Sequence, residues 1–340
     1  MLNDSNSKVT NKTNNNIKII SSTAEEKHEN KSKSISLSNH QDFYSTCPRI
    51  DKLTLTQHVL DQEHQMSIRD WIEGACDDGE GENFYSKGHK YYRYSYKFPI
   101  SADGRQNLLV QISPYWKKIP FLRIDWNPNK AGKLGNEIVQ DLCINFYLDS
   151  GYDFLYENAK ISRLDTCLDI ADLELDNILV TAPKIKNWAR YGTDKLETVY
   201  LGTQKSKNRY RIYNKRQQLI DVEKYDPSTL PIHLTRFESI QKNSGLTLAE
   251  LAQNMPNPFS DLAVVDKTHS DHYKDEFFLE YARQYGLPKA LNKIKNISTR
   301  TSYLKRLGMS AKLKIQWQPE IYWQEFQGYF ETSGLIPIHM

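Results

Sequence analysis

The alternation of hydrophobic and polar residues predicts that the first two thirds of the chain are rich in β-strands. Alternating segments bounded by turn residues are typical of half-buried strands, and they occur at 49–59, 90–100, 107–115, 119–127, 161–172, 197–202, 208–215 and 232–240. The pair 197–202 and 208–215 flanks a short polar turn, which predicts a hairpin.

A helical spacing replaces this alternation in three places. Leu134, Ile138, Leu142 and Phe146 recur at helical intervals, which predicts an amphipathic helix over 132–149 with these side chains on its buried face. Thr247 followed by Glu250 matches a capping box, and the pattern from about residue 271 onward is helical. Strands followed by helices predict an α+β fold, with an antiparallel sheet and a helical C-terminal part.

Composition divides the chain into three segments. Residues 1–40 hold eight Ser, eight Asn and no aromatic residue, so we expect 1–45 to be disordered. We expect residues 46–255 to form a catalytic domain. Residues 256–340 are expected to form a helical, basic DNA-recognition region that contributes to dimerisation.

The hydropathy of the chain leads us to expect neither a signal peptide nor a membrane span, and the net charge is +3. No run of about 18 apolar residues occurs, so no membrane span is expected, and the N-terminal segment lacks the apolar core of a signal peptide. Cys47, Cys76, Cys143 and Cys167 form no CxxC pair. We interpret them as free thiols in the reducing cytoplasm.

A stretch that contains basic but no acidic residues lies near the C-terminus. Residues 283–319 contain nine Lys or Arg and no acid, together with Tyr303 and Trp317. Such a stretch suits a polyanion, whereas the plainer alternative is a solvated helical surface balanced by acids elsewhere. We expect five of these side chains to bind DNA: Lys293, Lys295, Arg300, Lys305 and Arg306.

Charged residues gather on one face of the predicted strands, because successive side chains point to opposite sides. In 208–215 the residues on one face are Arg209, Arg211, Tyr213 and Lys215. In 161–172 one face carries Arg163, Asp165, Cys167 and Asp169, and Arg236 shares a face with Glu238 in the strand 232–240. The simplest arrangement is a sheet with helices on its apolar face and charge on the other.

Two interpretations of this charged face remain open. Antiparallel sheets often have one solvated face with cross-strand ion pairs. Alternatively, the face is an active site for phosphoryl transfer. In that case the carboxylates bind Mg²⁺ or Mn²⁺, the arginines bind the phosphate, and the tyrosine is the nucleophile. A phenol titrates near pH ~10, so it needs neighbouring cations to act at neutral pH.

The charged strands resemble four blocks of the Rep_trans family of rolling-circle replication initiators, found in staphylococcal-type plasmids. The blocks are "LRIDWNPNK" (122–130), "SRLDTCLDIADLEL" (162–175), "ETVYLGTQKSKNRYRIYNKRQQ" (197–218) and "HLTRFES" (233–239). The third block, with its R-I-Y-N-K run, is the most specific, and "EIYWQEFQGYF" (320–330) is similar to the family's C-terminal end.

The resemblance implies a specific activity. Family members nick one strand of origin DNA through a tyrosine that stays joined to the 5′ phosphate, and the released 3′ hydroxyl primes synthesis. The matching tyrosine is Tyr213, with Arg209, Arg211 and Lys215 around it. A divalent metal, Mg²⁺ or Mn²⁺, is implied, with Asp165, Asp169 and Glu238 as ligands.

The resemblance also implies partners and a general fold. Family members act as homodimers on origin DNA, recruit a host helicase and a host polymerase, and choose the origin with a region near the C-terminus. The implied fold is similar to that of the HUH endonucleases. Those enzymes bind metal through a His-hydrophobe-His pair, which this sequence lacks.

A rival hypothesis is a DNA-binding protein without catalysis, such as a plasmid or phage copy-number or partition factor. It explains the basic stretch but gives no reason for the acid and tyrosine face. A glycosidase fits poorly because the arginine-rich face suits anionic substrates. A tyrosine recombinase fits poorly because its arginines and histidine lie on helices.

Overall fold

The structure is a computed structural model, and all its described residues belong to one compact unit. The chain divides into Met1–Asp42 and Phe43–Met340, and the described residues are 47–59, 61–83, 91–144, 151–182, 185, 187–192, 197–266, 273–309 and 317–337. The predicted disorder of 1–45 and the predicted helical position of Phe146 therefore fall outside the described residues.

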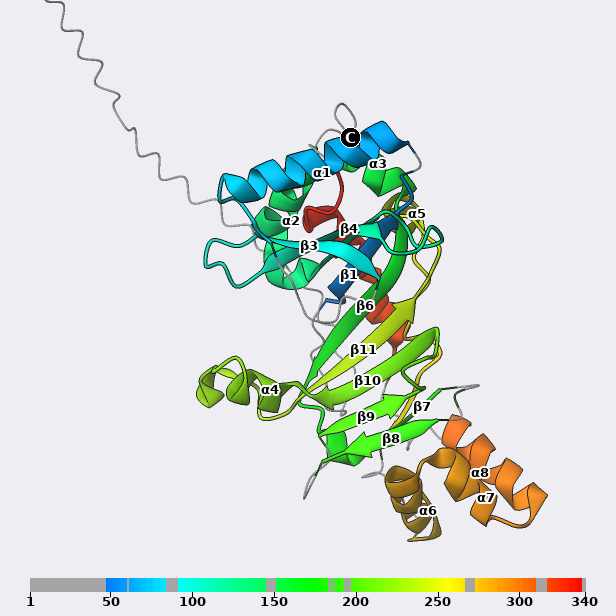
Figure 1. Cartoon of the computed structure of the whole chain (residues 1–340). Coiled ribbons are helices and arrows are strands. Elements are labelled where there is room, and N and C mark those ends of the chain that lie inside the picture. The colour runs from blue at the N-terminus through cyan, green and yellow to red at the C-terminus, as the bar shows by residue number, and fades with distance from the viewer. Residues whose placement is uncertain are drawn as a thin grey trace, which may run out of the picture. The chain divides into compact units, whose positions relative to one another are not determined.

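A large antiparallel sheet organises this unit, as the sequence predicts. Its strand order in the described residues is β2-β3-β4-β5-β1-β6-β11-β10-β9-β8. Figure 1 shows the second half of this order, in which β6, β11, β10, β9 and β8 follow one another down the picture. The strands are β1 (Arg49–Gln57), β2 (Glu82–Asn83), β3 (Tyr92–Pro99), β4 (Asn107–Pro114), β5 (Leu122–Trp126), β6 (Lys160–Ala171), β8 (Trp188–Tyr191), β9 (Thr198–Leu201), β10 (Asn208–Asn214) and β11 (Leu234–Lys242). A separate pair joins β7 (Ile178–Thr181) to β12 (Ala263–Asp266).

Helices connect and cover the strands. They are α1 (Gln62–Asp77), α2 (Pro128–Ile144), α3 (Gly151–Asn158), α4 (Lys215–Asp221), α5 (Leu248–Gln253), α6 (Tyr273–Tyr285), α7 (Leu287–Lys293), α8 (Ile297–Met309), α9 (Pro319–Gln324) and α10 (Phe326–Thr332). The predicted capping box at Thr247 is confirmed, because the Thr247 and Glu250 side chains each accept a backbone hydrogen bond from the other residue. The helix α1 was not predicted.

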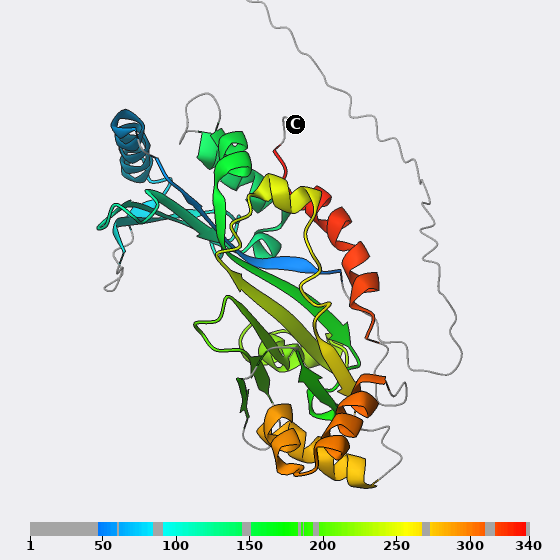
Figure 2. The same cartoon turned by 90° about the vertical axis from the view of Figure 1, so that its right-hand side faces the viewer.

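The apolar face of the sheet packs against helices. Leu53, Ile124 and Leu164 share one core with Ile68 of α1 and Phe330 of α10. In Figure 2, α5 and α10 lie along one side of the long strands. The α+β prediction, with one apolar face covered by helices and a helical C-terminal part, is confirmed.

A second core lies under the other half of the sheet. Ile212 of β10 and Phe237 of β11 are fully buried against Phe259 and Val264. Residues 256–340 thus supply side chains to the same cores as the sheet. The division at residue 255 stays a prediction. In the described part of the chain, no helix has both the length and the apolarity to cross a membrane.

The predicted helix 132–149 exists as α2, and its predicted buried face is correct only in part. Ile138 and Leu142 are half-buried against the core, but the fully buried side of the helix is centred on neighbouring residues. Leu134 is 67% exposed, whereas Val139 is buried and Asn136 and Gln140 are buried with it. The Asn136 amide donates to the Ser333 carbonyl at 2.8 Å, and the Gln140 amide donates to the Gly334 carbonyl at 2.8 Å. Buried amides that pair with the backbone are stable in a core, so a search for apolar periodicity misplaces this face.

Candidate active site

The predicted charged face exists as transverse rows of facing residues on adjacent strands. One row runs from β9 to β6 through Thr198, Tyr213, Arg236 and Asp169. The next row runs through Tyr200, Arg211, Glu238 and Cys167. Facing residues in an antiparallel sheet have Cα atoms about 4.5–5.5 Å apart, so each row brings its side chains together.

Tyr213 lies in the middle of this face, and its side chain is 6% exposed. The Arg211 guanidinium lies 4.4 Å from the centroid of its ring, and Arg236 faces it from β11. Tyr210 points to the opposite face, where its hydroxyl donates to the Pro258 carbonyl at 3.0 Å. The predicted division of the two tyrosines between the two faces is confirmed.

Burial controls the ionisation of Tyr213. Removal from water raises the pKa of the phenol above its usual range, and the positive charges of Arg236 and Arg211 only partly oppose this. The cations around the tyrosine therefore do not produce a phenolate in the free protein.

Asp169 is held by two arginines. Arg236 donates to both of its carboxylate oxygens, at 2.5 and 2.6 Å, and Arg49 donates to Oδ2 at 3.0 Å. Both Asp169 and Arg236 are buried. This fork fixes the guanidinium of Arg236 beside Tyr213, because a bidentate pair restrains both partners.

The other two predicted ligands are also paired with arginine. Asp165 accepts from Arg163 at 2.9 and 2.6 Å, and Glu238 lies 2.5 Å from an Arg211 nitrogen. Burial raises the pKa of Glu238 to about 7, and the Arg211 charge acts against this rise. Burial likewise raises the pKa of Asp165.

The raised pKa of Glu238 predicts a pH dependence of stability. The folded protein keeps this proton up to a pH of about 7, whereas an unfolded glutamate loses it near pH 4.5. The free energy of unfolding should therefore decrease as the pH rises from 4.5 to 7. Urea titrations across this window should show a shallower decrease for Glu238→Gln than for the native chain. Equal decreases would show that Glu238 is already ionised at the lower pH.

These carboxylates do not fit a metal centre as their side chains stand. Arginine nitrogens occupy the positions that a cation would take, and no group of three His, Cys, Asp or Glu in the described ranges is arranged to hold a metal. A requirement for Mg²⁺ or Mn²⁺, with Asp165, Asp169 and Glu238 as ligands, stays a prediction.

Two contributors to the face escaped the sequence analysis. The register of β1 against β6 shifts at a β-bulge between Ile50 and Lys52, and Asp51 lies on the face; it pairs with Arg236 at 3.5 Å and accepts from Asn127 at 3.2 Å. Arg49 reaches Asp169 from the same strand. Arg49 and Asp51 are two residues apart and flank the buried Ile50, so counting in twos along this strand could have placed both on the charged face. The β-bulge breaks the alternation only after Asp51, because Lys52 faces Asp165.

Lys215 is not on the strand where it was predicted. The strand β10 ends at Asn214, whose side chain accepts from the Gln217 amide at 3.0 Å and caps α4, so Lys215 begins that helix. Its ammonium is buried and lies 3.2 Å from Glu223. Burial lowers the pKa of Lys215, and the Arg236 charge adds to the effect.

A hollow of about 830 Å³ opens beside Arg236, between α4 and the β3–β4 turn. Its charged lining consists of Arg49, Arg105, Lys130, Lys215, Lys224, Arg236, Asp103, Asp169 and Glu223. Cations outnumber acids two to one in this lining, so the hollow suits an anionic chain.

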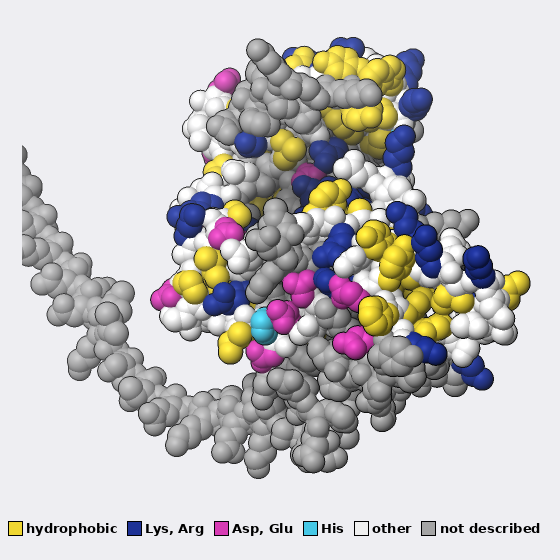
Figure 3. Space-filling view, turned by 90° about the horizontal axis from the view of Figure 1, so that it is seen from below, with side chains coloured by type: hydrophobic (Ala, Val, Ile, Leu, Met, Phe, Trp, Pro, Cys, Tyr) yellow, Lys and Arg dark blue, Asp and Glu magenta, His cyan; other side chains and the backbone are white. Residues whose placement is uncertain are grey.

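The five residues that were predicted to bind DNA lie on α7, on α8 and in the turn between them, whereas residues 310–316 of the basic stretch are outside the described residues. Lys293, Lys295 and Lys305 are exposed, and Arg300 is half-buried and donates to the Ile294 carbonyl at 3.0 Å. Arg306 belongs to α8, but its side chain lies outside the described set. In Figure 3 the right-hand side, where these helices lie, shows scattered Lys and Arg.

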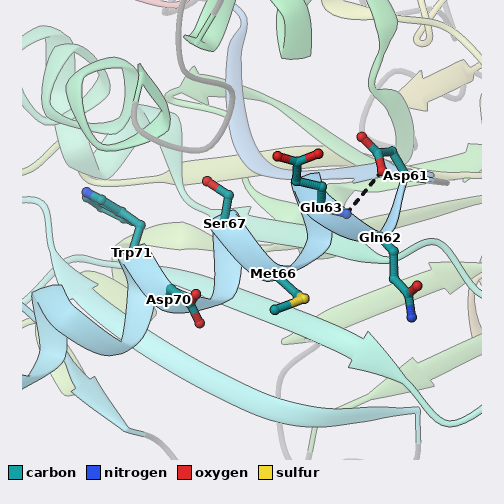
Figure 4. Close-up of a pocket in the computed structure, with 7 residues that line it drawn as sticks. All are labelled: Asp61, Gln62, Glu63, Met66, Ser67, Asp70 and Trp71. Atoms are coloured by element: carbon teal, nitrogen blue, oxygen red, sulfur yellow. Dashed lines mark hydrogen bonds between the residues drawn. The ribbon is translucent and has the colours of Figure 1, made fainter.

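Another hollow, of about 840 Å³, lies along α1 (Figure 4). Asp61, Glu63 and Asp70 line it together with Met66 and Trp71. Its acidic lining would repel a phosphate chain, and it belongs to a different element from the charged rows. We assign no chemistry to it.

The comparisons with known proteins found no similar family model or curated protein, but they found similar solved structures. A rolling circle replication initiator protein from Geobacillus stearothermophilus is a solved structure with 16% sequence identity to the chain and a TM-score of 0.37. The similarity covers 61% of this chain and 77% of the other.

Proposed function

We propose that this protein is a rolling-circle replication initiator that nicks and rejoins one strand of origin DNA through Tyr213. The observation that carries the proposal is the position of this phenol. It lies beneath the Arg211 guanidinium and faces Arg236, which Asp169 fixes in place. The R-I-Y-N-K resemblance supports the same residue.

The reaction is a phosphoryl transfer between two oxygens. The Tyr213 oxygen attacks the scissile phosphorus, an O–P bond forms, and the bond from phosphorus to the 3′ oxygen breaks. The phenol loses its proton and the departing 3′ oxygen gains one. Because one phosphodiester replaces another, the 3′ hydroxyl can reverse the step and close the strand.

The arginines act on charge that develops in the transition state. Arg211 lies over the Tyr213 ring and Arg236 faces Tyr213 from β11, so both cations are close to the position where the transferring phosphoryl oxygens gain charge. The phosphate brings negative charge into a buried and cationic site. Arg211 and Arg236, which are paired with Glu238 and Asp169 in the free protein, then also have to bind the phosphate oxygens.

DNA affinity should depend on the exposed lysines of α7, α8 and the intervening turn. Changing Lys293, Lys295 and Lys305 to Gln, with Arg306 as a fourth position, should flatten the plot of log affinity against log salt. Each lost phosphate contact should lower its slope by about 0.9. Lys133→Gln and Lys160→Gln are the control, since these lysines lie near Glu137 and Glu250. An unchanged slope in the first variant would place the DNA elsewhere.

A second candidate is a DNA-binding protein without catalysis. The buried phenol and the arginine-paired carboxylates favour it, because such a network also suits a structural role. Nicking of a supercoiled plasmid that carries the protein's own coding region, with and without Mg²⁺ or Mn²⁺, separates the two. Relaxed product supports the initiator, and unchanged supercoils support the alternative.

A homodimer, a host helicase and a host polymerase rest on the resemblance alone. The cytoplasmic location rests on the unpaired cysteines, and the divalent cofactor rests on the carboxylates of the charged face together with the resemblance. Each stays a prediction.

A further inference from the structure

An aromatic and basic track leads from the edge of the sheet to Tyr213. Tyr191 on the edge strand β8 faces Thr198, and Thr198 faces Tyr213, so the three belong to one row. Tyr191 is 59% exposed, whereas Tyr213 is buried. The row therefore runs from the open edge into the charged face.

The neighbouring row supplies a cation held on an aromatic ring. Tyr200 meets Tyr191 edge to face, with centroids 5.6 Å apart. The Arg209 guanidinium lies 3.9 Å from the Tyr200 centroid, and it forms no ion pair with a carboxylate among the residues that the structure covers. The Nε atoms of Arg209 and Arg211 are buried and have no hydrogen-bond partner within the same set.

These features differ from those of the rest of the charged face. Arg163, Arg211 and Arg236 each form an ion pair with a carboxylate, whereas Arg209 forms none within the described residues. An exposed tyrosine on an edge strand is ordinary by itself. Tyr191, however, lies close to the Arg209 guanidinium and in the same row as Tyr213. This combination is typical of the aromatic and cationic surfaces on which unpaired bases stack.

We propose that this track binds the single strand next to the scissile phosphate, an inference that rests on the proposed function. Tyr191 stacks one unpaired base, and Arg209, supported by Tyr200, binds the adjoining phosphate. One face of the Tyr200 ring is covered by Arg209, so the exposed ring of Tyr191 is the one that receives the base. A base within a duplex cannot offer its face in this way, so the track selects unpaired DNA.

The test measures binding without cleavage, in the full chain carrying Tyr213→Phe. Fluorescence anisotropy compares a labelled oligothymidylate with an abasic strand of the same length. Tyr191→Ala should weaken oligothymidylate binding about fivefold or more, which is the usual contribution of one stacked base. It should leave abasic binding unchanged, and Tyr191→Phe should retain the native affinity. Arg209→Gln should lower the salt slope for both strands by about 0.7.

Tyr115→Ala is the matched control, because Tyr115 is 53% exposed and Arg93 lies 5.8 Å from its ring, near β4. Native affinity in this variant supports the proposal, and a loss equal to that of Tyr191→Ala overturns it. Equal binding of the thymidine and abasic strands by the parent protein also overturns it. Nicking by the chain with Tyr213 intact is measured separately, so absence of nicking with intact base discrimination contradicts only the proposed function.

Discussion

Tyr213→Phe is expected to abolish nicking of origin DNA and to form no covalent protein–DNA adduct, while DNA binding survives. The substitution removes only the oxygen that attacks phosphorus. No described residue forms a hydrogen bond with that hydroxyl, and the ring keeps its position under Arg211. The variant should therefore unfold at the same urea concentration as the native chain. A supercoiled-plasmid assay and a denaturing gel measure the two activities.

Tyr210→Phe is the matched control three residues away. It removes the hydrogen bond from the Tyr210 hydroxyl to the Pro258 carbonyl, which should lower the free energy of unfolding by about 1 kcal/mol. Nicking should persist, because Tyr210 lies in the core on the other face. Nicking by Tyr213→Phe, or its loss only in Tyr210→Phe, would contradict the assignment.

Asp169→Asn is expected to lower the free energy of unfolding by about 3–5 kcal/mol, the usual effect of removing one partner from a buried ion pair. The change leaves the buried Arg236 without its bidentate partner and weakens the hold on Arg49. Urea denaturation of the two proteins measures the difference. Asp77→Asn, at an exposed residue at the end of α1, should have little effect.

The Asp169 result also decides how a loss of nicking is interpreted. The family resemblance implies that Asp169 is a metal ligand, and loss of nicking in Asp169→Asn would by itself agree with that role. The structure gives another cause, since a displaced Arg236 no longer faces Tyr213. A variant that is inactive yet as stable as the native chain would contradict the structural role.

The charged face could be predicted because strands alternate strictly. Counting in twos placed Tyr213 with Arg211 and Tyr210 with Ile212, and the register of β10 confirms both. The same count failed at Lys215, because Asn214 stops the strand and caps a helix. Periodicity does not record such caps until the neighbouring backbone is known.

Pairing between strands could not be read from one sequence. The arrangement that places Arg236 between Tyr213 and Asp169 depends on β11 lying beside β10 and β6, although β6 precedes them by many residues. The bulge after Asp51 depends on the same pairing. The sequence therefore predicted which residue types share the face, whereas the partner of each charge required the register.

The role of Tyr213 as the nucleophile is tested by locating the residue that becomes joined to DNA. The protein is incubated with single-stranded origin DNA and Mn²⁺, digested with trypsin, and its peptides are analysed by mass spectrometry. Cleavage after Arg209, Arg211 and Lys215 leaves Tyr210 and Tyr213 on different peptides. If Tyr213 is the nucleophile, the peptide Ile212–Lys215 will carry a 5′-phosphate-linked nucleotide. A nucleotide on any other peptide, with Ile212–Lys215 unmodified, would contradict this role.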